Sequence, residues 1–104
     1  MSLNDEKIRL TKILKHLEQH SGWHVYRVLD GEDKIPVDTV EEAIEHASAV
    51  EEATIRVHDT SGDNVASIMV VWGNGPEDII CDYTLAPGLM QALEHAEEAA
   101  DRHD

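Results

Sequence analysis

The chain of 104 residues is 41% apolar and holds 22 acidic against 8 basic residues, a net charge of −14 with neutral histidines. This length and composition predict a single globular domain over residues 1–104, and the negative charge should repel phosphate backbones, so we expect no direct nucleic-acid partner. Without a run of ~20 apolar residues, a secretory signal or a second cysteine for an intrachain disulfide, the sequence predicts a cytoplasmic protein that does not associate with membranes.

The charge is unevenly distributed along the chain. Residues 1–29 hold five bases and three acids, whereas residues 30–104 hold three bases and nineteen acids. The basic N-terminal segment can therefore face acids of the same chain, acids of a second copy in a homodimer, or an acidic partner. The sequence alone leaves these three arrangements open.

Residues 4–20 have the apolar period of an amphipathic helix. The apolar stripe consists of Leu3, Leu10, Ile13, Leu14 and Leu17. Asn4 is the expected N-cap, and Gly22 is expected to end the helix because glycine takes a left-handed conformation at low cost.

Residues 23–30 alternate as expected for a strand and are rich in β-branched and aromatic residues. One side of this strand would carry Trp23, Val25, Arg27 and Leu29, and the other side His24, Tyr26 and Val28. Asp30 and Gly31 predict a tight turn. The return segment 34–37 contains Pro36, which limits it to a sheet edge or an extended connector.

Two more helices are predicted. One begins at Asp38 and Thr39, where Thr39 with Glu42 and also Asp38 with Glu41 have capping-box spacing. The other begins near Pro87, whose missing N–H costs nothing at a helix N-terminus. Between them the period switches to two, so residues 53–58, 65–72 and 79–85 are expected to form an antiparallel meander. The predicted fold is α+β: a small antiparallel sheet, made of this three-stranded meander plus one strand or hairpin, with about three helices packed on one face.

The glycine-rich segment 73–78 could in principle bind a phosphate or simply turn the chain. A phosphate loop needs converging N–H groups and usually a following helix, but Pro76 lacks an N–H, and Glu77 and Asp78 add negative charge. The segment that follows is expected to be a strand. We therefore predict a hairpin turn in which Gly73 and Gly75 supply positive φ angles.

Histidines and the single cysteine are the candidates for catalysis or metal binding. His16 and His20 have helical i, i+4 spacing suited to Zn²⁺, but no acidic third ligand occurs at matching spacing. Cys81 with His24 or His58 could form the centre of a small enzyme or metal site, although a lone strand cysteine is most often a small buried apolar residue. Because no catalytic motif accompanies them, we expect no enzymatic activity, no metal and no cofactor.

Acidic residues on the outer sides of the second and third predicted helices are the remaining candidate surface. They are Glu41, Glu42, Glu45, Glu94, Glu97, Glu98 and Asp101. They could serve solubility, adaptation to high salt, or docking of a basic partner, including mimicry of a nucleic-acid backbone that inhibits a host nucleic-acid-binding protein.

Three segments carry a resemblance to other proteins: residues 25–37 with Asp30-Gly31-Glu32, residues 53–72 with Asp59 to Gly62, and residues 73–83 with the sequence GNGPEDIICDY. They resemble a group of small acidic phage, prophage or plasmid-borne proteins of unknown function. The resemblance implies a mobile-element origin and supplies no catalytic or binding residue. Together with the missing catalytic set, it leaves a non-enzymatic protein-interaction module as the expected function.

Overall fold

The computed structural model describes residues 3–31, 33–75, 78–86 and 88–101. Its elements in chain order are α1 (Leu3–His16), the π-helical turn η1 (Leu17–Ser21), β1 (His24–Leu29), β2 (Lys34–Pro36), α2 (Val40–Ala47), β3 (Glu52–His58), β4 (Val65–Val71), β5 (Ile80–Tyr83) and α3 (Leu89–Asp101). The predicted α+β class is confirmed.

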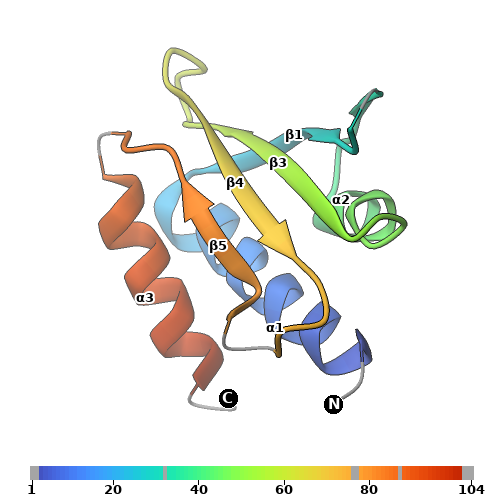
Figure 1. Ribbon diagram of the computed structural model, residues 1–104. Coiled ribbons are helices and arrows are strands. Elements are labelled where there is room, and N and C mark those ends of the chain that lie inside the picture. Colours follow the sequence, from blue (N-terminus) through green and yellow to red (C-terminus); the bar gives the residue numbers. More distant parts are fainter. Residues whose placement is uncertain (1–2, 32, 76–77, 87, 102–104) are drawn as a thin grey trace.

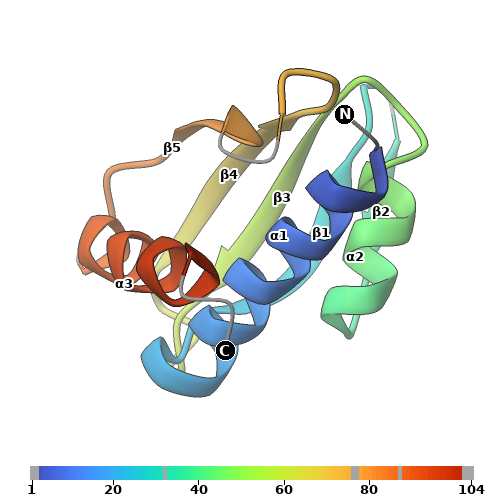
Figure 2. The ribbon, with the colours of Figure 1, turned by 90° about the horizontal axis from the view of Figure 1, so that it is seen from below.

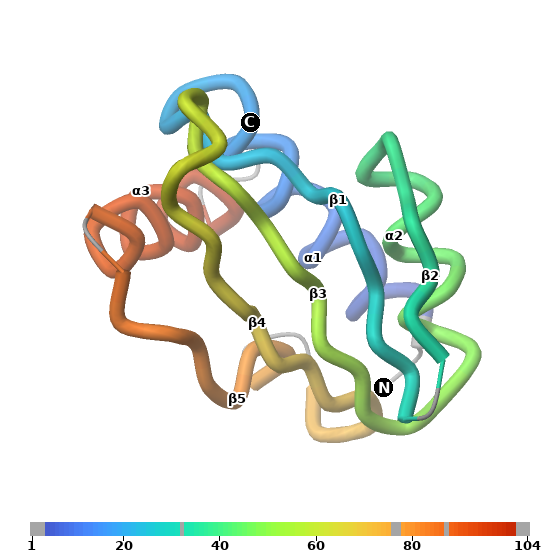
Figure 3. The backbone as a smooth tube through the Cα atoms, turned by 90° about the horizontal axis from the view of Figure 1, so that it is seen from above, coloured from blue at the N-terminus to red at the C-terminus, as the bar shows by residue number. Residues whose placement is uncertain are grey.

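The five strands form one antiparallel sheet in the order β2-β1-β3-β4-β5. The return segment with Pro36 is the edge strand β2. The sheet therefore consists of the three-stranded meander and the hairpin of β1 and β2. All three helices pack on one face of the sheet, and α1 lies between α2 and α3 (Figures 1 and 2). No helix of the described residues lies on the opposite face, and Figure 3 looks onto that face.

The first helix ends as predicted but begins earlier. Asn4 lies inside α1 and not at its N-cap, because helical backbone already starts at Leu3. At the other end, the left-handed Gly22 (φ 74°) donates its N–H to the carbonyl of Leu17 and closes the wider turn η1. A Cβ on Gly22 would lie 2.6 Å from the methyl group of Thr60, so the β3–β4 loop also requires a glycine here.

The second helix begins at the predicted capping box. The Glu42 N–H donates to the Thr39 hydroxyl at 3.1 Å, and the Glu42 carboxylate accepts the Asp38 N–H at 3.2 Å. The prediction for Pro87 at the start of α3 lies outside the described residues. No helix in the described part of the chain is long and apolar enough to cross a membrane.

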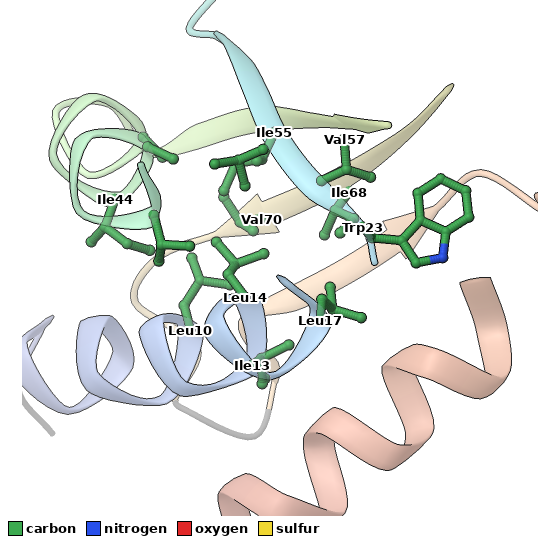
Figure 4. Packing of buried hydrophobic residues seen from close by; sticks show 14 of the residues in the cluster. Leu10, Ile13, Leu14, Leu17, Trp23, Ile44, Ile55, Val57, Ile68 and Val70 are labelled. Carbon is green, nitrogen blue, oxygen red and sulfur yellow. The ribbon is translucent and has the colours of Figure 1, made fainter. Parts of the chain in front are cut away.

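The core lies between the helices and the covered face of the sheet. Figure 4 shows Leu10 and Leu14 of α1 and Leu17 of η1 pointing toward side chains of β3 and β4. Of the predicted α1 stripe, Leu10, Ile13, Leu14 and Leu17 are buried, and the side chain of Leu3 lies outside the described residues. The strands contribute alternate residues, chiefly Ala53, Ile55, Val57, Ala66, Ile68 and Val70.

Two irregularities break the predicted alternation in the sheet. The register of β1 against β3 shifts between Val25 and Arg27, so that Val25 and Val28 both face the core and Tyr26 is an extra residue. The register of β4 against β5 shifts in the same way, since Met69 lies opposite Asp82 but Val70 lies opposite Ile80. The alternations predicted for residues 23–30 and 79–85 are therefore wrong beyond these points.

Candidate binding face

The sheet face opposite the helices, toward the viewer in Figure 3, is here called the uncovered face. Its strand residues form two halves with different side chains. At the end where β1 starts and β3 ends, the basic half consists of His24, Tyr26, Arg27, Arg56 and His58. At the other end, the apolar half is a shallow hollow lined by Leu29, Thr54, Met69, Val71 and Cys81 among others. The strand acids of this face, Glu52 and Asp82, belong to the apolar half.

The basic half is ordered by cross-strand neighbours. His24 lies opposite His58, with ring centroids 5.8 Å apart, and Arg27 lies opposite Arg56. The Tyr26 ring lies 5.5 Å from the His58 ring, and the guanidinium carbon of Arg27 lies 5.7 Å from the centroid of Tyr26. The bulge in β1 brings Tyr26 next to these cations, and its ring face favours a nearby positive charge.

Neither arginine of the basic half has an acidic partner among the described residues. Among the described residues, ion pairs join Arg9 to Asp101 and Lys15 to Glu41, and Nδ1 of His24 lies 3.8 Å from the Glu18 carboxylate. The Nε atom of Arg56 is buried and lacks a hydrogen-bond acceptor within this part of the chain. A buried donor without an acceptor costs free energy, and because Nε is buried a ligand can reach this guanidinium only through its terminal nitrogens.

Two acids beside the basic half, Asp59 and Glu18, are bound to groups other than the two arginines. Hydrogen bonds, first from the Asn64 side chain and then from the Ser61 hydroxyl, lower the pKa of Asp59 from 3.8 to about 2. The Glu18 carboxylate accepts the Val25 N–H at 3.3 Å. Both carboxylates therefore stabilise local backbone and leave the arginine pair without a counter-ion.

The apolar half forms an open hollow of about 450 Å³. Met69 is 44% exposed there, and Cys81 is exposed as well, so the expectation of a buried cysteine is wrong. The bulge explains the error, because Cys81 is the extra residue of β5 and Ile80 and Tyr83 take the positions against the core. The Cys81 thiol lies 3.5 Å from the Met69 carbonyl, a weak hydrogen bond.

Cys81 and the two strand histidines share the uncovered face but do not meet. Cys81 lies beside Met69, which pairs with Thr54, four residues along β3 from His58. That separation is about 13 Å along the strand. In the described ranges, no three histidine, cysteine, aspartate or glutamate side chains are close enough together to hold a metal ion. His16 and His20 stack on each other with centroids 4.4 Å apart.

The seven acids predicted as a docking surface lie on two separate flanks of the helical layer. Glu41, Glu42 and Glu45 belong to α2, the other four belong to α3, and α1 runs between them (Figure 2). Lys15 of α1 pairs with Glu41 at 2.5 Å, and Arg9 pairs with Asp101. The basic N-terminal segment therefore packs against acids of its own chain on both flanks.

The pKa values of these acids reflect their surroundings. The hydrogen bond from Lys15 is the main reason that the pKa of Glu41 is lowered. Burial is the main reason that the pKa of Glu97 is raised. The charge of Arg9 opposes this rise, and the charges of Asp101 and Glu94 add to it. The acids are thus partly used to hold the helices together, and they do not form one continuous surface.

The glycine-rich loop is a turn, as predicted, because it joins the antiparallel neighbours β4 and β5. Its N–H groups also converge, but on a carboxylate of the same chain. Glu6, only 3% exposed, accepts the Gly73 N–H on both oxygens at 2.9 and 3.0 Å and the Gly75 N–H at 3.2 Å. The arguments from Pro76 and Glu77 concern positions outside the described residues.

Sequence reasoning missed both Glu6 and the arginine pair. Glu6 looked like an ordinary acid in the first turn of a helix, and its partners lie 67 and 69 residues away. For the two arginines, the sequence did contain a signal: both occur within predicted strands of a chain that is otherwise strongly acidic. No protein-family model, curated protein or solved structure matches this chain, so its site must be argued from its own residues.

Proposed function

We propose that this chain is a non-enzymatic protein-interaction module that binds its partner on the uncovered face of the sheet. One observation carries the proposal: all three helices pack on one side, so five strands present a broad face with exposed apolar residues and with two arginines that lack an acidic partner in the described part of the chain. Antiparallel sheets tolerate a solvated face, but that face is usually polar. Here Val65 and Met69 are 47% and 44% exposed.

The separation of Cys81 from His24 and His58 supports a binding role over catalysis. A nucleophile and its base must lie within hydrogen-bond reach, whereas these groups occupy different halves of the face. The hollow beside Cys81 is shallow and open, and such a site excludes water poorly. Both features suit recognition of another surface.

The sheet face also fits a docking role better than the acidic helices do. Carboxylates that mimic a nucleic acid must form one regular array, but those of α2 and α3 are separated by α1 and partly paired. Docking of a basic partner on these helices remains a prediction, as does the mobile-element origin suggested by the sequence resemblance. The uncovered face instead favours a partner that carries negative charge.

Two exposed methionines allow a matched test. Met69 on the uncovered face and Met90 on α3 are 44% and 48% exposed. Each is replaced in turn by a photo-reactive methionine analogue, and proteins crosslinked in cells that naturally express the chain are identified by mass spectrometry. The purified partner is then titrated against the Met69→Asp and Met90→Asp variants.

We expect one protein to crosslink at position 69 and not at position 90. Its affinity should fall at least about tenfold for Met69→Asp, because a charge would be desolvated at the interface, and remain unchanged for Met90→Asp. Equal affinity of the two variants, or crosslinking at position 90 alone, would contradict the proposal.

A further inference from the structure

We propose that the basic half of the uncovered face recognises carboxylates of an extended acidic segment of the partner, with Arg27 and Arg56 as paired anchors. This inference rests on the proposed function and names the partner's chemistry. The apolar half, on the same strands, would receive an apolar side chain of the same segment.

The first support is the position of the two arginines. They lie directly opposite each other on β1 and β3, where Cβ atoms are only about 5 Å apart. Like charges in such positions destabilise a sheet when no counter-ion lies between them. An anion that bridges both guanidinium groups removes this repulsion, so ligand binding and relief of the repulsion are coupled.

The second support is the unsatisfied Nε of Arg56. The buried Nε of Arg9 also lacks an acceptor, but the terminal nitrogen of that arginine pairs with Asp101. No comparable pair exists for Arg56 among the described residues. A guanidinium presents its N–H groups as a planar fork, which matches the two oxygens of a carboxylate.

The third support is the packing of the Tyr26 ring beside the basic side chains. The Tyr26 ring touches both the Arg27 guanidinium and the His58 ring, and His58 lies beside His24. Packing of this kind limits the rotamers of Arg27, so less entropy is lost when an anion binds. The cluster is therefore organised before the ligand arrives.

Charge complementarity selects an acidic partner segment. The strand positions of the uncovered face hold three bases, Arg27, Lys34 and Arg56, against the two acids Glu52 and Asp82, in a chain with a net charge of −14. A long nucleic acid would meet the repulsion of the whole domain, whereas a short acidic segment interacts mainly with this local patch.

The spacing of the two halves predicts a sequence pattern in the ligand. Along β3, Arg56 and Thr54 of the hollow are two residues apart on the same face, a distance of about 7 Å. An extended peptide places its own alternate side chains at the same interval. The preferred segment should therefore carry an acidic residue two positions from an apolar residue.

Capped peptides of eight residues that alternate glutamate with valine provide the probe, at about 50 mM salt where charge interactions are weakly screened. A matched peptide has glutamine in place of glutamate, and single-stranded oligothymidylate represents nucleic acid. Binding is followed by NMR of the ¹⁵N-labelled full chain, including the side-chain Nε–H signals of Arg27 and Arg56.

We expect the glutamate peptide to shift the Nε–H signals of both arginines and the glutamine peptide to shift neither. The Arg27→Gln and Arg56→Gln variants should each bind at least about tenfold more weakly, the usual loss for a charged hydrogen bond. Lys12→Gln, the same change of charge at an exposed position of α1, should bind within about twofold of the unchanged chain.

Equal binding of the two peptides, an equal loss in Lys12→Gln, or tighter binding of oligothymidylate would overturn the inference. Arg56→Lys keeps the charge but loses the fork, so it should fall between Arg56→Gln and the unchanged chain. If the crosslinked partner requires Met69 but binds the arginine variants normally, the inference fails and the proposed function stands. If Met69→Asp has no effect, the proposed function itself has failed.

Discussion

The two faces of the sheet are built by the same strands yet differ in how their side chains are satisfied. On the covered face, Ile55 and Ile68 are fully buried beneath α1. On the uncovered face, their neighbours along the strands include Arg56, which has no ionic partner among the described residues, and Met69, which is 44% exposed. Alternation along a strand therefore separates residues that stabilise the fold from residues free to recognise another molecule.

Charges on the helical side show the same contrast. Arg9 and Lys15 of α1 are paired with acids of the helices on either side, and the buried Glu6 is held by loop N–H groups. The arginines of the basic half have no such partners in the described part of the chain. Four measurements test this contrast.

The largest effect should come from adjacent residues on opposite faces of β4. Ile68→Ala should lower the free energy of unfolding by about 2–5 kcal/mol, since it leaves a cavity in the core. Met69→Ala should change it by less than about 0.5 kcal/mol. Urea unfolding of both variants provides the measurement, and similar losses would mean that the uncovered face contributes to the core.

The contact between Glu6 and the glycine-rich loop should have the next largest effect. Glu6→Ala leaves the N–H groups of Gly73 and Gly75 without their acceptor and should cost about 1–3 kcal/mol in the free energy of unfolding. Amide hydrogen exchange should also become faster at both glycines. Glu45→Ala, an exposed acid on α2, serves as the control and should cost much less. Unchanged exchange at Gly73 would contradict the assignment.

A change in the arginine pair should have a smaller effect on the free energy of unfolding, and it should raise this free energy. Arg27→Glu replaces a like-charged cross-strand pair with an opposite-charged pair, which should raise the free energy of unfolding by about 0.2–1 kcal/mol relative to Lys12→Glu. Both variants change the net charge equally. Urea unfolding at low and high salt measures the difference, which should shrink as salt screens the charges. If Arg27→Glu is less stable than Lys12→Glu at low salt, the Arg27 guanidinium already has a negative partner in the folded protein.

The most local effect concerns Asp59 at the rim of the basic half. Its pKa is lowered to about 2, so its hydrogen bonds stabilise the folded loop above about pH 4 and are lost as the pH falls toward 2. Asn64→Ala should raise this pKa toward its ordinary value, as measured by carboxyl ¹³C NMR. Asp63→Asn removes a neighbouring charge but none of these bonds, and serves as the control. If the pKa of Asp59 is unchanged in Asn64→Ala, the hydrogen bond from Asn64 does not hold this carboxylate. Asp59 would then be available to pair with the cations of the basic half.

The sequence predicted the features that depend on local chemistry. Thr39 with Glu42 fixed the start of α2, Gly22 fixed the end of the first helix, and the apolar period of residues 89–100 matches the buried side of α3. Each of these signals lies within a few residues of the structure it specifies, so no knowledge of distant contacts is required.

The uncovered face could not be predicted because two bulges determine it. One extra residue at Tyr26 and one at Cys81 reverse the direction of every side chain beyond them, and alternation alone does not reveal a bulge. Glu6 was missed for a different reason. Its partners are almost the whole chain away, and an acid in the first turn of a helix already has an adequate local explanation.

The contact between Glu6 and the glycine-rich loop has a consequence for how the protein assembles. During synthesis α1 emerges before β4 and β5, so its buried carboxylate is bound, and its apolar side is fully covered, only after those strands have left the ribosome. Contacts between such distant parts of a chain slow folding. Until then the apolar side of α1 is partly exposed in the nascent chain. Chaperones that shield apolar surface would act on this chain at that stage.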